Sequence, residues 1–155
     1  MMLAEILLPK LSEWRPAGAG RHSWGQSADG WSIHLAVDKA DSLSCLVWEL
    51  TLSRDGTSPA GLTLAGWAAG IADRVSGLIE PLKVYEVDTT SNVAILRSES
   101  PTRKGDARTY YEVVLHGLTR ALVRRHSGSS TPGREQIAFA LTHEVVTKLA
   151  GDIAG

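Results

Sequence analysis

The sequence predicts an α+β domain, in which an antiparallel sheet of about five to seven strands is packed by two long helices. Three observations support this fold class. Apolar and polar residues alternate over 31–37 and 43–53, and again over 108–116, whereas apolar residues recur every three or four positions over 64–79. Alternation is typical of half-buried strands, and the longer spacing is typical of an amphipathic helix. The expected order is an optional helix, three strands, a helix, three or four strands and a helix.

Residues 1–20 are expected to form an irregular or short helical N-terminal arm. Leu3, Ile6 and Leu7 share one helical face, and Pro9 limits that helix because proline lacks the backbone N–H group. A short strand is expected near 22–26. The following Asp29-Gly30 pair is a strong hairpin signal where strands flank it.

The middle of the chain reads as two strands and a long helix. In the strands over 31–37 and 43–53, every second side chain is apolar. Ser58 is suited to cap the first long helix, Pro59 suits its first position, and Pro81 ends it.

The second half reads as strands followed by the closing helix. We expect strands over 82–87, 93–97, 108–116 and 118–125, with a polar loop over 98–106 and a bulge or tight turn at Gly117. The closing helix is expected to begin at Thr131-Pro132. Its apolar stripe comprises Ile137, Ala140, Leu141, Val145, Leu149 and Ile153.

Length and composition indicate one ordinary globular domain over residues 1–155, with 43% apolar and 21% charged residues. The lone Cys45 cannot form an internal disulfide, which fits a reducing compartment. The N-terminus lacks the basic region of a signal peptide, so we expect a cytoplasmic location.

The formal net charge of −1 gives no whole-protein field that would attract nucleic acid or an anionic membrane. The charge is nevertheless uneven. Residues 1–96 carry 7 Lys/Arg and 11 Asp/Glu, whereas residues 97–155 carry 9 and 6. This polarity suits self-association or a charged ligand.

No metal or cofactor motif is complete, so we expect neither a metal nor a cofactor. His143-Glu144 resembles the start of the zinc-protease HExxH motif, but Thr147 stands where the second histidine belongs. The segment 128–135 has the spacing of a phosphate-binding P-loop, but Arg134 replaces its lysine and Pro132 removes a backbone N–H.

The best chemical cluster lies on the strand over 108–116. Tyr110, Glu112 and His116 project from one sheet face if that strand is unbroken. Glu112 and His116 could then act as acid and base, with Tyr110 as a hydrogen-bond donor. His34 would join them only if the strands pair in a suitable order. The alternative reading is the solvated face of a half-exposed sheet.

Two further sets of residues suggest a binding surface. Trp14 and Trp24 lie in irregular segments, and tryptophan is enriched where proteins bind partners. Arg120 and Arg124 belong to a basic region that extends from Arg97 to His126. Such arginines, with Tyr110 and its neighbour, could bind single-stranded nucleic acid weakly. Basic strands also protect sheet edges against aggregation.

These observations order the hypotheses about function. The first is a protein-interaction module, an adaptor or chaperone-like domain that forms a homodimer. The second is a small-molecule-binding or hydrolase-like enzyme that uses Glu112 and His116 in a helix–sheet cleft, and the third is a weak single-stranded nucleic-acid binder. The element order is similar to that of small secretion chaperones, which implies a homodimeric α/β fold but names no site residue.

Overall fold

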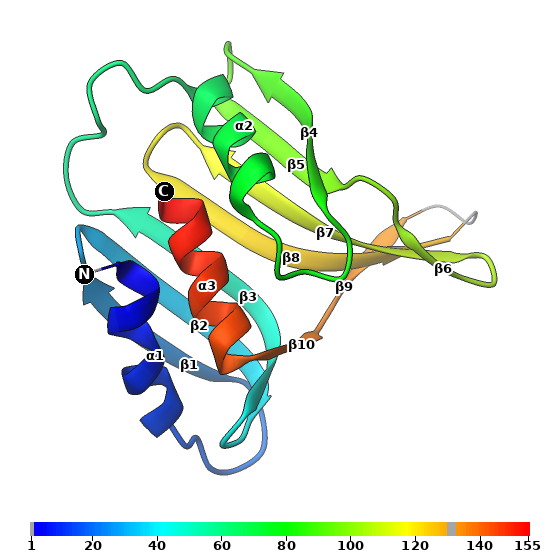
Figure 1. The fold of residues 1–155 in the computed structure, drawn as a ribbon. Coiled ribbons are helices and arrows are strands. Elements are labelled where there is room, and N and C mark those ends of the chain that lie inside the picture. The colour runs from blue at the N-terminus through cyan, green and yellow to red at the C-terminus, as the bar shows by residue number, and fades with distance from the viewer. Residues whose placement is uncertain (1, 130–132) are drawn as a thin grey trace.

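The computed structural model describes residues 2–129 and 133–155 as an α+β fold with three helices and ten strands (Figure 1). The helices are α1 (Leu3–Glu13), α2 (Leu64–Arg74) and α3 (His143–Ala154). The first five strands are β1 (His22–Ala28), β2 (Trp31–Ala40), β3 (Ser44–Arg54), β4 (Leu82–Asp88) and β5 (Val93–Ser98). The others are β6 (Thr102–Lys104), β7 (Ala107–His116), β8 (Arg120–Gly128), β9 (Arg134–Ile137) and β10 (Phe139–Thr142).

All the strands belong to one antiparallel sheet, whose main path runs β1-β2-β3-β8-β7-β5-β4. Short β6 folds back on β7. Strands β3 and β8 pair only over Leu50–Ser53 and 120–123. Beyond that point they separate, and the gap is filled by β9, which pairs with β8, and by β10, which pairs with β3. The sheet therefore forks in its middle.

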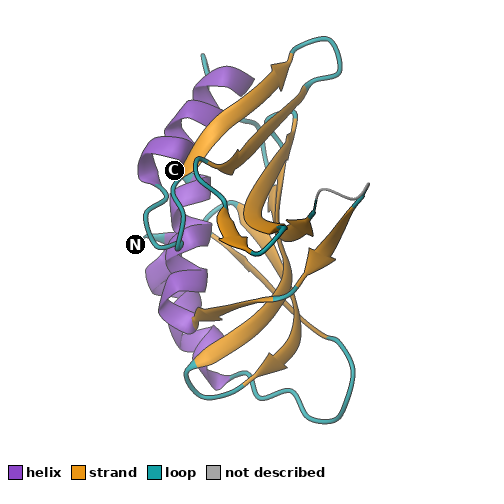
Figure 2. Cartoon of the chain, turned by 90° about the vertical axis from the view of Figure 1, so that its right-hand side faces the viewer, coloured by secondary structure: helices purple, strands orange, loops and turns teal. Residues whose placement is uncertain are grey.

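The three helices lie in one layer on one face of the sheet (Figure 2). The core lies between the two layers, because the apolar side of each element points there. Its largest fully buried side chains include Leu7, Leu11, Leu35, Leu50, Leu52, Ile71, Leu96, Leu115 and Ile153. The α+β class and the antiparallel sheet are thus confirmed. The expected five to seven strands and two long helices are wrong, because the chain forms a larger sheet with three helices of 11 or 12 residues.

The first helix is longer than its proline predicts. α1 continues through the exposed Pro9 to Glu13, although this proline was expected to limit the helix. Leu3, Leu7 and Leu11 form one buried row along the helix. A proline inside a helix costs about 3 kcal/mol. Burying each leucine returns about 1.5–3 kcal/mol, so the packing outweighs the lost hydrogen bond.

The hairpin at Asp29-Gly30 is formed as predicted. Asp29 has φ 52° and Gly30 has φ 83°, the left-handed pair that a two-residue turn with matched strand twist requires. The turn pairs Ala28 with Trp31 and fixes the register of β1 along β2. A second left-handed glycine, Gly117 at φ 56°, makes the tight turn between β7 and β8. Strand β8 is therefore a separate antiparallel strand rather than a bulged continuation of β7.

Both predicted long helices are shortened. α2 begins at Leu64, where the Thr63 hydroxyl accepts the Gly66 amide at 3.0 Å, and it ends at Arg74. The cap at Ser58 and the continuation to Pro81 are wrong, because Gly61 turns the chain at φ 80° and Ile79 is exposed.

The closing helix begins at His143, capped by Thr142, and not near residue 131. Its expected start, Thr131-Pro132, lies outside the described residues. The segment before His143 forms β9 and β10 because Phe139 and Leu141 alternate into the core.

A buried ion pair fixes the chain between α2 and β4 to the sheet. Both guanidinium nitrogens of Arg125 donate to the Glu80 carboxylate at 2.9 Å. The Ser98 and Thr102 hydroxyls donate to the same carboxylate at 2.7 and 2.6 Å. Although burial opposes ionisation, these hydrogen bonds hold the pKa of Glu80 below its ordinary value. Arg125, one of the residues of the predicted basic surface, is therefore a core residue.

Candidate functional site

The sheet face opposite the helices carries the most concentrated chemistry of the molecule. Side chains alternate along a strand, so residues between core positions point to this opposite face. On β7, Glu112 lies between the core residues Tyr111 and Val113. We call the surface the open face, since no helix covers it (Figure 2). It is formed by residues of β3, β4, β5, β7, β8 and β9, among them Glu49, Tyr85, Arg97, Tyr110, Glu112, Arg124, His126 and Arg134.

Glu112 is the centre of the open face, although only 4% of its surface is exposed. Arg97 on β5 donates through Nε to Oε2 of Glu112 at 2.9 Å. Arg134 on β9 donates through Nη1 to the same oxygen at 2.8 Å and through Nη2 to Oε1 at 3.3 Å. Side chains from β5 and β9 thus converge on one carboxylate of β7.

The two arginines determine the charge state of this carboxylate. Burial raises the pKa of Glu112, but the hydrogen bonds from Arg134 and Arg97 outweigh it and leave the pKa below its ordinary value. Glu112 is therefore an ionised counter-ion at neutral pH. A group in that state neutralises its arginines and has no proton to donate.

His126 on β8 lies beside this cluster and is uncharged at neutral pH. Its Nε2 is 3.6 Å from Oε1 of Glu112, and its ring centroid is 5.8 Å from that of Tyr110. Burial, followed by the charge of Arg134, lowers the pKa of His126. Among the described residues, neither ring nitrogen has a hydrogen-bond partner.

Arg97 also lies between two tyrosine rings. Its guanidinium carbon is 4.2 Å from the ring centroid of Tyr85 on β4 and 5.5 Å from that of Tyr110 on β7. The Tyr110 hydroxyl accepts a hydrogen bond from Arg134 at 3.1 Å. Cation–π contacts of this kind restrain both rings. Tyr85 nevertheless remains 55% exposed.

Two hollows flank Tyr110 at this end of the sheet. One, of about 300 Å³, is lined by residues that include Lys83, Tyr85, Arg97 and Glu99. The other, of about 460 Å³, is lined by residues that include Arg103 and Asp106. Arg108 and Tyr110 line both. We define Lys83, Arg103 and Arg108 as the basic rim. All three are exposed, and none has an ion pair within the part of the chain that the structure describes.

The remaining predicted acid–base residues lie apart from Glu112. His116 is exposed at the other end of β7, about 13 Å further along the strand. His34 on β2 is separated from β7 by β3 and β8, which corresponds to roughly 14 Å across the sheet. The open face therefore brings together Glu112 and Tyr110, but not His116 or His34.

The predicted partner residues are dispersed over the molecule. Trp14 follows α1 and Trp24 lies on the helix side of β1, and both are half-buried against the core. Arg120 is exposed at the start of β8. Arg124, further along β8, donates to Glu49 on β3 at 2.6 Å and extends the charged cluster of the open face.

Sequence reasoning missed Tyr85 and Arg134 as members of this cluster. Tyr85 could have been noticed as an aromatic residue on the strand expected over 82–87. Arg134 had no such signal, because the pattern around it predicts a helix rather than β9. Its approach to Glu112 follows from the pairing of β9 with β8 and of β8 with β7.

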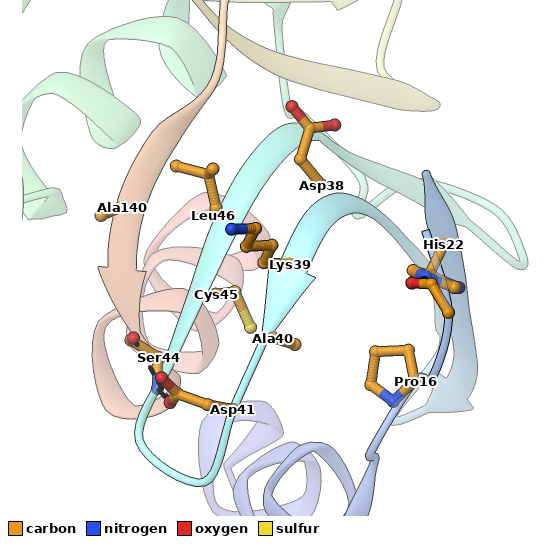
Figure 3. Close-up of a pocket in the computed structure, with 11 residues that line it drawn as sticks. Pro16, His22, Asp38, Lys39, Ala40, Asp41, Ser44, Cys45, Leu46 and Ala140 are labelled. Atoms are coloured by element: carbon orange, nitrogen blue, oxygen red, sulfur yellow. Dashed lines mark hydrogen bonds between the residues drawn. The ribbon is translucent and has the colours of Figure 1, made fainter. Parts of the chain in front are cut away.

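A separate hollow of about 370 Å³ lies beside the β2–β3 turn, and Figure 3 shows its lining. His22 lies across it from Cys45. Burial raises the pKa of the Cys45 thiol to about 11, so the sulfur is protonated and a poor nucleophile. The Asp41 carboxylate accepts the amides of Leu43 and Ser44 at 2.8 Å, which stabilises the turn itself. The Cys45 thiol is therefore not an activated nucleophile in this hollow.

Within residues 2–129 and 133–155, no group of three or more His, Cys, Asp or Glu side chains is arranged to hold a metal ion. In the same part of the chain, no helix has the length and apolar character needed to cross a membrane. Comparison with protein-family models, with the curated proteins and with the solved structures finds no match to this chain. The site must therefore be interpreted from its own geometry.

Proposed function

We propose that the chain is a protein-binding domain whose open face binds its partner, with the basic rim as the anchor for an acidic segment. The observation that carries this proposal is that the three cations of the basic rim, which are exposed and have no ion pair among the described residues, line the two hollows that flank Tyr110. An adaptor or chaperone-like role is the class of function that such a surface serves.

The charge of the two hollows favours an acidic partner. Their linings carry four cations and two carboxylates, namely Lys83, Arg97, Arg103 and Arg108 against Glu99 and Asp106. Arg97 and Arg134 both pair with Glu112, so these three side chains together carry one net positive charge. The surplus of positive charge is therefore local to this end of the sheet, in a chain whose net charge is −1. Complementary charge raises association rates and excludes wrong partners.

The aromatic residues favour a protein partner. Tyrosine and arginine are enriched among the residues that carry binding energy at protein interfaces. Tyr85 and Tyr110 are already ordered by Arg97, so a partner that packs on them immobilises few additional side chains. A nucleic acid needs several phosphate contacts and free aromatic faces, and Arg97 already occupies the space between these two rings.

The enzyme hypothesis makes a different prediction. In it, Glu112→Gln and His116→Ala leave folding intact and abolish ligand binding. The arrangement supplies no argument for it, since the Glu112 carboxylate is neutralised by two arginines and His116 is remote.

We would test the proposal by fluorescence anisotropy with a labelled peptide of alternating glutamate and leucine. The wild-type chain should bind this peptide at low salt, and added salt should weaken the binding. Arg108→Glu should weaken binding at least about tenfold, because it reverses a charge that faces both hollows. Lys10→Glu, an equal charge change on exposed α1, is the matched control and should have no effect.

A lysine–leucine peptide and a ten-nucleotide oligothymidine complete the design. Equal effects of Arg108→Glu and Lys10→Glu would show that only net charge matters and would overturn the proposal. Tighter binding of the oligonucleotide than of the acidic peptide would favour the nucleic-acid hypothesis instead. Circular dichroism of each variant checks that the fold is retained.

A further inference from the structure

The two outer edges of the sheet differ in how they are protected. β4 ends the sheet on one side, and it carries the charged Lys83 and Glu86 and a bulge at Tyr85. Charges and bulges of this kind prevent an edge strand from pairing with another chain. β1 ends the sheet on the other side. Over residues 23–28 it has no charged residue, no proline and no bulge in its pairing with β2.

The register of β1 shows which backbone groups face outward. In a hairpin with a two-residue turn, the residues that flank the turn exchange both backbone hydrogen bonds, and the pattern then alternates along the strands. Ala28 therefore bonds to β2, as do Gln26, Trp24 and His22. The N–H and C=O groups of Ser23, Gly25 and Ser27 point away from β2, to the free edge. The Gln26 side chain donates to the outward Ser27 carbonyl at 3.0 Å, as expected for a carbonyl without a strand partner.

The outward residues are symmetric about Gly25. Ser23 and Ser27 lie two positions to either side of it, and all three are small and exposed on the open face. A second β1 can therefore approach antiparallel, so that Gly25 pairs with Gly25 of the other copy and Ser23 with Ser27. Each of these three pairs is of the hydrogen-bonded type, because the groups of both members already point outward.

We propose that β1 is a homodimerisation edge, at which two copies of this chain pair antiparallel about a two-fold axis through Gly25. The axis is perpendicular to the sheet, so both helix layers lie on the same side. Trp24 then lies on that side opposite Gln26 of the second copy. Two copies satisfy this contact, because the pairing uses β1 of both copies and the opposite edge, β4, is protected by its charges and its bulge. The edge is only seven residues long, so we expect a weak dimer that depends on concentration.

The two-fold axis gives a position-specific test by disulfide cross-linking. In the proposed pairing Gly25 faces itself, with Cα atoms about 5.5 Å apart, which a disulfide can span. Gly25→Cys should therefore give a covalent dimer under mild oxidation. Ser27→Cys is the matched control, since its own copy in the partner lies about 13 Å away. It should cross-link only when mixed with Ser23→Cys. The native Cys45 is 1% exposed and does not interfere.

Sedimentation equilibrium from about 10 µM to about 1 mM provides the second measurement. The wild-type chain should dimerise over this range. Gly25→Lys, which places two like charges face to face, should raise the dimer dissociation constant at least about tenfold. The lysine Cβ at position 25 fits without a clash inside one copy, because the nearest atom would be the Ile33 carbonyl oxygen at 3.8 Å. Gly56→Lys, at an exposed glycine with open space around it, is the control for charge and should leave the dimer intact.

Equal cross-linking rates for Gly25→Cys and Ser27→Cys would indicate random collisions and overturn the proposal. Sedimentation of the wild-type chain as a monomer at every concentration would also overturn it. β1 and the basic rim are at opposite edges of the sheet. Acidic-peptide binding by Gly25→Lys therefore reports on the proposed function alone, and the two proposals can fail independently.

Discussion

Replacing Glu80 by alanine should be among the most destabilising single substitutions in this chain. The Glu80 carboxylate accepts four hydrogen bonds, two from Arg125 and one each from Ser98 and Thr102. Its removal leaves the guanidinium of Arg125, which is 8% exposed, without its counter-ion in the core. Breaking a buried pair in this way costs about 3–5 kcal/mol. Urea unfolding followed by tryptophan fluorescence measures the loss.

Removing an exposed ion pair should cost much less stability than removing this buried one. Asp38→Ala removes a similar contact, with Arg21, but those side chains are 34% and 45% exposed, so the cost should stay below about 1 kcal/mol. The double variant Glu80→Leu with Arg125→Met should recover most of the stability, since an apolar pair has no charge left to compensate. A loss below about 1 kcal/mol for Glu80→Ala, or a double variant as unstable as the single one, would refute this account.

Three other predictions use the same unfolding assay. Thr142→Ala removes the hydroxyl that caps α3 and should cost about 1 kcal/mol. Gly117→Ala should cost about 1–2 kcal/mol, because φ is 56° there and the new Cβ would lie 2.8 Å from Nδ2 of Asn92. Gly56→Ala is the control, since open space surrounds that glycine. An equal loss of stability in the two variants would contradict this prediction. The folded-state pKa values of Glu80 and Glu112 lie below their ordinary values, so the unfolded chain takes up protons first as the pH falls below about 4.3. The free energy of unfolding should therefore decrease in that pH range, and Glu112→Gln should reduce the slope of this free energy against pH. An unchanged slope would contradict this prediction.

The sequence predicted the regular parts of the fold because their patterns are local. Alternation over 31–37 and 108–116 locates β2 and β7, and the Asp29-Gly30 pair locates the first turn. These signals depend on neighbouring residues alone, so one chain suffices to read them. The antiparallel α+β class follows from the order of such elements.

The errors arose where distant packing overrides the local pattern. Pro9 predicts the end of a helix, but burial of Leu11 extends α1 beyond it. Residues 134–142 have helical spacing, yet they form β9 and β10 because the fork between β3 and β8 offers them backbone partners. No pattern within the segment itself reveals that fork.

The sequence predicted only part of the candidate site, because local patterns reveal one strand of it and not the strands beside that one. Glu112 and Tyr110 share the face that alternation along β7 assigns to them. The partners of Glu112 come from β5 and β9, so they depend on the strand order, which the sequence does not contain. The identity of these partners changes the role assigned to Glu112, because a carboxylate held by Arg97 and Arg134 is a counter-ion rather than a general acid.

The fork in the sheet also constrains when the domain can fold during translation. The segment that fills it is followed directly by α3, which packs on α1 and accepts the Trp67 indole N–H at the carbonyl of Ile153. Until residues 134–155 have left the ribosome, β3 lacks its second neighbour along half its length, and the apolar rows of α1 and α2 lack part of their cover. The nascent domain therefore completes its core only after this segment emerges, and it exposes apolar surface until then.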